Sequence, residues 1–243
     1  MADYKKLAPL FAGWQEALIW SCLDGCMGYA VADSFETPLS AQIVVGDFCF
    51  FAGEPNAELA AKAAAPLMIP RTEEWGETLD AVWKDRTEKA LRYAIKKESD
   101  VFSINKLKKY TQSLPDGYTL KLFDEKIYND TRAEEWSVDF CSLFADYEDY
   151  RRRGLGAAVL YKGNPVSGAS SYAVYNGGIE IEIDTKEEFR QKGLATVCGA
   201  KLILECLKRG LYPSWDAHDL RSVALAEKLG YHLDCPYPVY VKK

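Results

Sequence analysis

The sequence predicts a mixed α/β (α+β) fold in which a mostly antiparallel sheet is flanked by helices. Isoleucines alternate with carboxylates over residues 179–184, and this period of two is typical of a half-buried strand. A long apolar run with helical spacing follows at 194–209, after one short polar turn. Two further strand-like runs, 157–161 and 166–175, come just before, and Asn176-Gly177-Gly178 is a strong hairpin signal between the second run and the isoleucine strand. Antiparallel strands that lead into a long helix predict this architecture.

Composition favours a soluble globular protein and argues against several function classes. The chain has 243 residues, of which 48% are hydrophobic and 27% are charged. The net charge is -6 and no basic run exceeds Arg151-Arg152-Arg153, which argues against duplex nucleic acid as a partner. No apolar stretch reaches the ~18 residues of a membrane span, and the N-terminus lacks the apolar core of a signal peptide. We therefore expect a cytoplasmic protein without a nucleic-acid or membrane partner.

The cysteines point in the same direction. There are seven, scattered and odd in number, which predicts buried reduced thiols rather than a disulfide framework. Cys22 and Cys26 lie four residues apart on a predicted helix, but no histidine is near them, so they make a poor zinc site. We expect no metal.

Residues 1–115 are predicted to form an N-terminal α/β domain. The predicted elements are helices at 14–23, 57–65, 73–83 and 104–113, and strands at 41–52, 67–69 and 91–96. Asp47 and the aromatic strand 48–51 either line a pocket or belong to the core. The Pro-Asp-Gly turn at 115–117 marks the predicted boundary.

Residues 116–243 are predicted to form a second domain. The predicted elements are strands at 118–123, 157–161, 166–175 and 179–185, helices at 125–131 and 146–150, a helix at 194–209, a strand at 211–216, a helix at 219–229, and a last hairpin of 231–233 and 239–241 around Pro236. From the first of these strands onward, the main order is β-β-β-α-β-α-β.

The turn between the isoleucine strand and the long helix has the features of an anion site. The first turn of a helix leaves about four backbone N–H groups without partners, and the helix dipole makes that end positive. A glycine there lets a phosphate approach closely, and Arg190-Gln191-Lys192-Gly193-Leu194-Ala195 supplies one. Neither G-x-x-x-x-G-K-[ST] nor G-x-G-x-x-G is present, so the predicted ligand is a diphosphate of another kind.

The motif R-x-x-G-x-A after an acidic strand resembles the coenzyme A pyrophosphate loop of the GNAT N-acetyltransferase superfamily. A second landmark lies about 30 residues later, where 219–231 resembles the family's helix after its fifth strand, usually N-x-x-S followed by an apolar stripe and K-L-G-[FY]. Together the two motifs identify residues 118–243 as similar to the GNAT fold.

Three further stretches, 46–55, 178–185 and 211–218, resemble a bacterial group of uncharacterised GNAT proteins that carry an N-terminal extension. This closer resemblance covers nearly the whole chain and implies no particular substrate. Three roles stay open for the N-terminal half: substrate recognition, a degenerate second copy of the fold, or an element of a homodimer.

The resemblance implies acetyl-CoA as co-substrate and assigns residues to it. The pyrophosphate would meet the amides of Gln191 to Thr196, with added charge from Arg190 and Lys192 unless these point to solvent. The full loop set is Arg190, Gln191, Lys192, Gly193, Leu194, Ala195 and Thr196. The pantetheine arm would pair with the backbone of Ile183, Asp184 and Thr185, which would also polarise the thioester carbonyl.

Two positions depart from the family pattern. Asp219 stands where the family often has Asn, so it can accept from a pantetheine amide or cap its helix, but it cannot donate. Ser222 would contact a phosphate or take no part in binding. Ala226 stands where many members have the tyrosine that protonates the thiolate.

Proton transfer is assigned to a short set of candidates. Glu180 and Glu182 share one strand face, which the resemblance puts near the thioester, and either is a candidate general base. The same carboxylates fit two other interpretations: a solvated face, or an acidic lining that attracts a cationic amine. For the acid, His218 is our candidate, with Tyr231, Tyr240 or water as substitutes.

The sequence therefore predicts an N-acetyltransferase that moves an acetyl group from acetyl-CoA to an unidentified primary amine, on a small molecule or a protein. The alternative is a non-catalytic CoA-binding or scaffold protein on the same fold, which the missing tyrosine favours. An unrelated α/β enzyme or assembly module is the third interpretation.

Overall fold

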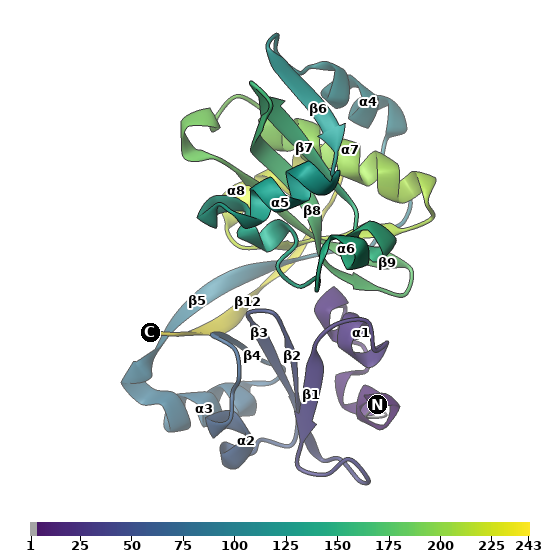
Figure 1. The fold of residues 1–243 in the computed structure, drawn as a ribbon. Helices are drawn as coiled ribbons and strands as arrows, with labels where there is room; N and C mark the ends of the chain where they lie inside the picture. Colours follow the sequence, from purple (N-terminus) through teal and green to yellow (C-terminus); the bar gives the residue numbers. More distant parts are fainter. Residues whose placement is uncertain (1–3) are drawn as a thin grey trace. The chain divides into compact units, whose positions relative to one another are not determined.

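The computed structural model describes residues 4–243. The chain divides into two compact units, one made of the residues up to Tyr93 together with Cys235–Lys243, and the other of Ala94–Asp234 (Figure 1). Each unit combines helices with a mostly antiparallel sheet, which confirms the predicted fold class.

The first unit is built on strands in the order β1-β2-β3-β4-β12-β5. Its elements are η1 (Tyr4–Phe11), α1 (Ala17–Leu23), β1 (Tyr29–Ala32), β2 (Ser40–Val45), β3 (Phe48–Gly53), α2 (Ala57–Ala61), β4 (Leu67–Pro70), α3 (Glu73–Trp83), η2 (Lys84–Arg86), β5 (Thr87–Ile95) and β12 (Leu233–Lys242). Helix α3 begins where the Thr72 side chain caps it by accepting from the Trp75 amide. Trp75 then packs with Phe51 and Tyr240 in the core of this unit.

The second unit holds a five-stranded sheet in the order β10-β9-β8-β7-β6. Its elements are α4 (Ile104–Gln112), β6 (Tyr118–Leu122), α5 (Glu125–Arg132), η3 (Glu135–Phe140), α6 (Tyr147–Arg153), β7 (Gly156–Tyr161), β8 (Asn164–Tyr175), β9 (Gly178–Thr185), η4 (Glu187–Phe189), α7 (Leu194–Lys208), β10 (Tyr212–Ser214), β11 (Asp216–Ala217) and α8 (Leu220–Leu229).

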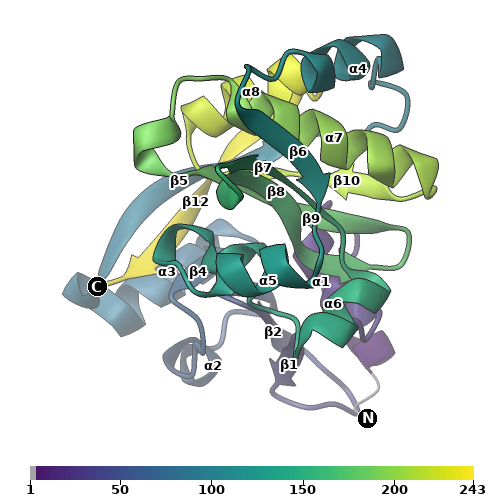
Figure 2. The same cartoon turned by 45° about the horizontal axis from the view of Figure 1, so that its top comes forward.

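Helices cover both faces of this sheet. Figure 2 shows α7 on one face and α5 and α6 on the other. Gly199 of α7 lies so close to β9 that an added Cβ would be 3.3 Å from Ile183 Cδ1. On the opposite face, an added Cβ at Gly168 of β8 would lie 2.6 Å from Phe140 of η3. The isoleucines of β9 therefore face α7, and its carboxylates face η3, α5 and α6.

Four element predictions were wrong, each because a turn or a pairing is not visible in local pattern. The predicted strand 211–216 forms two short strands, β10 and β11, which belong to different sheets. Residues 41–52 form two strands, β2 and β3, which turn at Gly46-Asp47, where Gly46 has φ +53°. Strand β1 lies at 29–32, between the helix predicted at 14–23 and the strand predicted at 41–52, where no element was predicted. Residues 233–242 form one strand, β12, rather than a hairpin around Pro236.

The division of the chain differs from the predicted boundary at 115/116. Helix α4 packs against α7 and so belongs to the second unit. Strand β12 pairs with β4, with Tyr240 opposite Met68, and so returns the C-terminus to the first unit. Both differences come from contacts between residues more than 80 positions apart.

Among residues 4–243, no helix is both long and apolar enough to cross a membrane.

Candidate functional site

The most distinctive feature of the second unit is a splayed pair of strands. Strand β9 pairs with β8 from Gly178 to Thr185, but with β10 only from Gly178 to Glu180. The last pair is Glu180 opposite Ser214, and the following strand, β11, does not belong to the sheet that contains β9. Within the described part of the chain, the pairing with β10 thus ends at Glu180, and β9 continues to Thr185 along β8. A strand edge of this kind can pair with an extended ligand that carries amides.

The edge leads to the mouth of helix α7. Gly193 is the N-cap residue of α7, in the left-handed region at φ +76°, and no side chain caps the helix. Nothing lies within 4 Å of where a Cβ on Gly193 would be. Gln191 is also left-handed, at φ +62°. The loop therefore presents an open helix N-terminus, as the sequence predicts, with amides and a dipole suited to an anion.

The two basic side chains of this loop bond to nearby backbone. Arg190 Nε donates to the Thr185 carbonyl at 3.0 Å, and its guanidinium lies 3.5 Å from Asp184. Lys192 Nζ donates to the Glu188 carbonyl at 3.1 Å and lies 4.7 Å from the Phe189 ring centroid. Both cations are thus held at the loop.

The strand that precedes the loop is fixed from the α7 side. Thr185 Oγ1 and Ser167 Oγ lie 2.7 Å apart, and Cys198 of α7 donates to the same serine at 3.7 Å. Asp184 accepts from the Thr185 amide at 2.6 Å. Ile183 contacts α7, so the backbone of all three residues is held in place.

The two candidate bases differ in environment. Glu180 is 5% exposed, whereas Glu182 is half-buried. Burial raises the pKa of Glu180, the nearby Lys97 ammonium opposes this, and the Asp216 carboxylate adds to it. Among the described residues, Glu180 Oε2 and Ser214 Oγ are buried without a hydrogen-bond partner. Ser214 is opposite Glu180 in the strand register and lies close enough to lower the pKa of that carboxyl, so the two residues mark the polar centre of the site.

The start of α8 lies near the C-terminal part of β9. Asp219 chiefly raises the pKa of Arg221, and the negative charge of Asp184 also contributes. Asp219 caps α8 by accepting from the amides of Arg221 and Ser222, each at 2.9 Å. Partial burial would raise the pKa of Asp219, but the Arg221 guanidinium and the two amides outweigh it and lower the pKa to about 2. Ser222 Oγ accepts from Trp215 Nε1 at 3.1 Å.

The candidate proton donors are in three different settings. His218 is 79% exposed, and its Nδ1 lies 3.8 Å from Asp219 Oδ2. Tyr231 is buried and donates to the Pro213 carbonyl at 2.7 Å, and burial raises its pKa well above the usual value. Tyr240 belongs to the first unit and donates to Asp80 at 3.3 Å. Ala226 is buried in the core.

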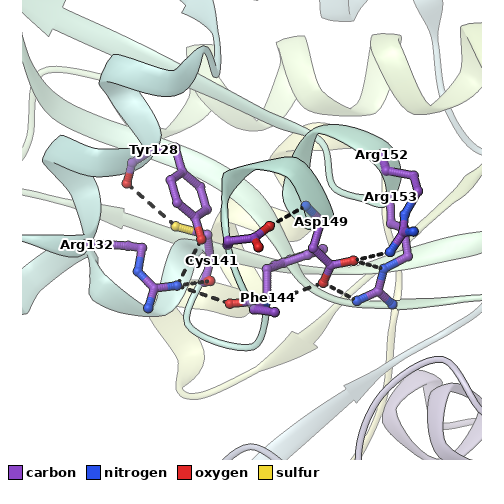
Figure 3. Close-up of polar contacts among 9 residues, drawn as sticks. Tyr128, Arg132, Cys141, Phe144, Asp149, Arg152 and Arg153 are labelled. Carbon is purple, nitrogen blue, oxygen red and sulfur yellow. Dashed lines mark hydrogen bonds and ion pairs between the residues drawn. The ribbon is translucent and has the colours of Figure 1, made fainter.

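The carboxylate face of β9 is bordered by a segment, residues 125–153, that is held by side-chain hydrogen bonds. Figure 3 shows Arg132 donating to the Tyr128 hydroxyl and to the carbonyls of Cys141 and Phe144, at 3.0, 3.3 and 3.1 Å. The Tyr150 hydroxyl lies 2.7 Å from Ser170 Oγ, and Ser170 is opposite Glu182 in the sheet. The segment that faces the carboxylates is thus tied to the sheet beside them.

The helix at the end of this segment, α6, carries its own charge network. Asp149 pairs with Arg153 and Arg152 at 2.6 and 2.7 Å, and these contacts hold its pKa below the usual range (Figure 3). An open hollow of about 660 Å³ lies over α6 and is lined by Ala145, Asp146, Glu148, Asp149, Arg151 and Arg152. Its charges pair with one another, so we assign no ligand to it.

Two residues at the apex were not predicted from the sequence to belong to the site. Ser214 lies in the predicted strand 211–216, but only the pairing register shows that it faces Glu180. Lys97 lies in the half of the chain that was assigned no chemistry, and its Nζ donates to the Trp215 carbonyl at 3.0 Å. Neither has a local sequence signal, because both act through pairings of distant segments. Within residues 4–243 no cluster of His, Cys, Asp and Glu side chains is suited to a metal ion.

Comparison with known proteins shows the family of this chain. A sequence model of the family described as GNAT acetyltransferase matches residues 8–240, and so spans both units. The chain is 43% identical to a GCN5-related N-acetyltransferase-like protein from Streptococcus suis 89/1591, whose crystal structure superposes with a TM-score of 0.95 over 99% of this chain and 98% of that one. A GCN5-related N-acetyltransferase from Kribbella flavida, 14% identical with a TM-score of 0.58 over 99% of this chain and 95% of that one, shares the fold alone.

A curated relative is more distant. YdfB of Bacillus subtilis (strain 168), an uncharacterised N-acetyltransferase, is 30% identical over 175 residues, which are 71% of this chain and 64% of YdfB. The match thus spans less than two thirds of that protein's length. From the near-complete family match and these relatives, the chain belongs to the GNAT acetyltransferase family.

Proposed function

We propose that this protein moves an acetyl group from acetyl-CoA to a primary amine, carried by a small molecule or by a protein. The carrying observation is the continuity of the splayed β9 edge with the uncapped mouth of α7. An acyl-CoA is long, with amides in its arm and a diphosphate beyond them, and this edge and helix mouth offer complementary groups in the same order.

The residues present fit the co-substrate. The amides of Gln191 to Thr196 would hold the diphosphate, and Arg190 and Lys192 would add positive charge beside it. The backbone of Ile183 to Thr185 would pair with the pantetheine amides. Asp219 and Ser222, at the start of α8, would line the other side of the arm.

The apex of the splay supplies proton transfer. The amine nitrogen attacks the thioester carbonyl carbon, a C–N bond forms, the C–S bond breaks, and CoA leaves as a thiolate that takes up a proton. We assign the proton of the amine to Glu180. Because Glu180 Oε2 is enclosed in the resting protein, the transfer runs through a bridging hydroxyl or water. Glu182, which is half-buried on the same face, attracts and orients the cationic amine. His218, exposed beside α8, donates the proton to the thiolate.

Binding and turnover test this proposal in two stages. Acetyl-CoA at millimolar concentration should raise the melting temperature, and a thiol-release assay against a panel of primary amines should then detect turnover. H218Q should lower the rate of thiol release without changing the affinity for acetyl-CoA. Absence of any thermal shift with acetyl-CoA would remove the proposal altogether.

A second candidate function is favoured by one observation. Ala226 occupies the position of the usual thiolate protonator, and the hydroxyl of Tyr231 is already bonded to a backbone carbonyl. A protein that binds acetyl-CoA without transferring its acetyl group would show the thermal shift and no thiol release with any amine.

The cell compartment and partners belong to the same proposal. All seven cysteines are free thiols, which fits the reducing cytoplasm. The net charge of -6 favours cationic acceptors over nucleic acid. A homodimer stays a proposal that light scattering can test.

A further inference from the structure

A short segment from the N-terminal half of the sequence reaches the apex of the splay. Tyr212 Oη of β10 donates to the Lys96 carbonyl at 3.2 Å and accepts from the Glu98 amide at 3.0 Å. Between these two residues, Lys97 Nζ donates to the Trp215 carbonyl at 3.0 Å. Three consecutive residues therefore follow β10 along the stretch that contains Ser214.

The same segment is anchored on its other side. The Lys96 amide donates to the His232 carbonyl at 2.9 Å, and Glu98 Oε2 lies 2.7 Å from His232 Nδ1. The position of Lys97 is thus set by contacts on both neighbours and not by its own flexible side chain alone. Its ammonium is held one residue from Ser214, the residue that faces Glu180.

The charged groups around Glu180 come from several elements. From β11, Asp216 adds negative charge, and from the segment, Lys97 adds positive charge. Burial chiefly raises the pKa values of the Tyr212 and Tyr231 phenols, and the nearby Glu180 carboxylate raises them further. Glu182 shares its strand face, η3 carries Glu135 and Asp139, and on α7, against the other face, Lys201 pairs with Glu205 at 2.8 Å.

We propose that Lys97 is a positioning residue for the reaction: its ammonium is the counter-charge that keeps the enclosed Glu180 carboxylate ionised and able to accept a proton. A buried carboxylate next to Asp216 would otherwise take up a proton, since neither burial nor a like charge favours ionisation. The proposal rests on the proposed function only for its catalytic consequence. The electrostatic relation between Lys97 and Glu180 exists in the resting protein.

The decisive measurement is therefore made without substrate. In protein with ¹³C-labelled glutamate, the Glu180 carboxyl resonance is assigned by its loss in E180Q and followed against pH. We expect its titration midpoint to rise by about one pH unit in K97M, because a nearby opposite charge shifts a carboxyl by ~1–3 units. K97R keeps the charge and should keep the midpoint.

A matched control lies on the same segment. E98Q removes the carboxylate charge beside His232 but keeps a side chain that can hydrogen-bond there, and it keeps the backbone bonds of Lys96 and Glu98 that anchor the segment, so the Glu180 midpoint should stay within ~0.3 units of the wild-type value. K97Q serves in place of K97M if the latter does not fold, as judged from its amide spectrum. A Glu180 midpoint that is unchanged in folded K97M or K97Q overturns the proposal.

Measurements of turnover distinguish the proposed role of Lys97 from the proposed acetyltransferase function. In K97M, the acid limb of kcat/KM for acetyl-CoA should move to higher pH, and the rate above the limb should stay within ~2-fold of wild type. If the Glu180 midpoint moves but no amine is acetylated, the counter-charge stands and the proposed function falls. If an amine is acetylated but neither the midpoint nor the limb moves in K97M, the function stands and the role of Lys97 falls.

Discussion

At the scale of single residues, the informative contrast is between two glutamates that the sequence treats as equivalent. Glu180 and Glu182 are separated by one residue and share a strand face, yet only Glu180 lies at the last pair before β9 and β10 separate. Its environment penalises the charged form, since burial raises its pKa. A half-buried neighbour such as Glu182 keeps contact with water and is better suited to meeting a substrate than to receiving its proton.

The two side chains should therefore give different kinetic losses. E180Q should lower kcat of thiol release by ~100-fold or more, the usual cost of removing a general base, with little change in the affinity for acetyl-CoA. E182Q should chiefly raise the KM of a cationic amine. Equal losses of kcat in both variants would contradict the division of roles.

Stability offers a check on Glu180 that needs no substrate. Because its pKa is raised above the usual 4.5, the folded state binds this proton more tightly than the unfolded state. Wild-type protein should therefore lose free energy of unfolding relative to E180Q as the pH rises above ~4.5. Urea unfolding at pH 4 and pH 7 measures the difference, and a gap between the two proteins that stays constant would show that Glu180 is not penalised.

At the scale of elements, helices α7 and α8 differ in how their N-termini are capped. Helix α7 begins at a glycine with open space and no cap, whereas α8 begins at Asp219, which satisfies two amides. The first amides of an uncapped helix have no acceptor within the helix. A bound diphosphate would accept hydrogen bonds from them and so stabilise the helix.

Gly193 should matter for binding as well as for backbone geometry. Ala at φ +76° costs about 1 kcal/mol of stability, and its methyl group would stand where a phosphate approaches. G193A should weaken acetyl-CoA binding by ~10-fold in calorimetry, equivalent to about 1.4 kcal/mol. Gly210, at φ +69° beyond the other end of the same helix and also in open space, supplies the control. G210A should lose similar stability and no affinity, and equal losses of affinity would place the binding site elsewhere.

Asp219 should act mainly as a helix cap. D219A should lose about 1 kcal/mol in urea unfolding at pH 7, whereas D219N, with a side chain that also caps, should lose less. The pKa of Asp219 falls from 3.8 to about 2 in the folded state, so the ionised form stabilises the fold fully above pH 3.8. The advantage of wild type over D219N should shrink as the pH falls toward 2. If D219A matches wild type at pH 7, the cap contributes nothing.

At the scale of the whole molecule, local signals predicted what lies within one stretch of sequence. The strand, loop and helix from Ile179 to Lys208 needed only periodicity and one glycine, and the family followed from two such motifs. Pairings between distant residues were out of reach. Ser214 opposite Glu180, Lys97 on Trp215 and β12 beside β4 each depend on register between segments that no local pattern encodes.

Because β12 returns to the first unit, we expect Tyr240 to have a structural role in that unit. Its ring is buried among Trp75, Leu79 and Met68 in the core of that unit, and Lys89 lies 5.0 Å from the ring centroid. The phenol is thus a packing group whose hydroxyl contacts Asp80 and Lys89. Substituting it should affect the stability of the first unit and leave the chemistry of the second unit intact.

Y240A should lower the free energy of unfolding by about 3 kcal/mol, because it removes a buried aromatic ring and leaves a cavity. Y240F keeps the ring and loses the hydroxyl contacts with Asp80 and Lys89 at the surface of the unit, so it should cost about 1 kcal/mol or less. Hydrogen exchange should show faster opening of β4 and β12 in Y240A, with α7 and β9 unchanged. Y240F should release thiol at the wild-type rate, because the hydroxyl that it removes bonds to Asp80 in the first unit. A large loss of kcat in Y240F with full stability would instead make Tyr240 the proton donor to the thiolate, and would give the C-terminal strand a chemical role.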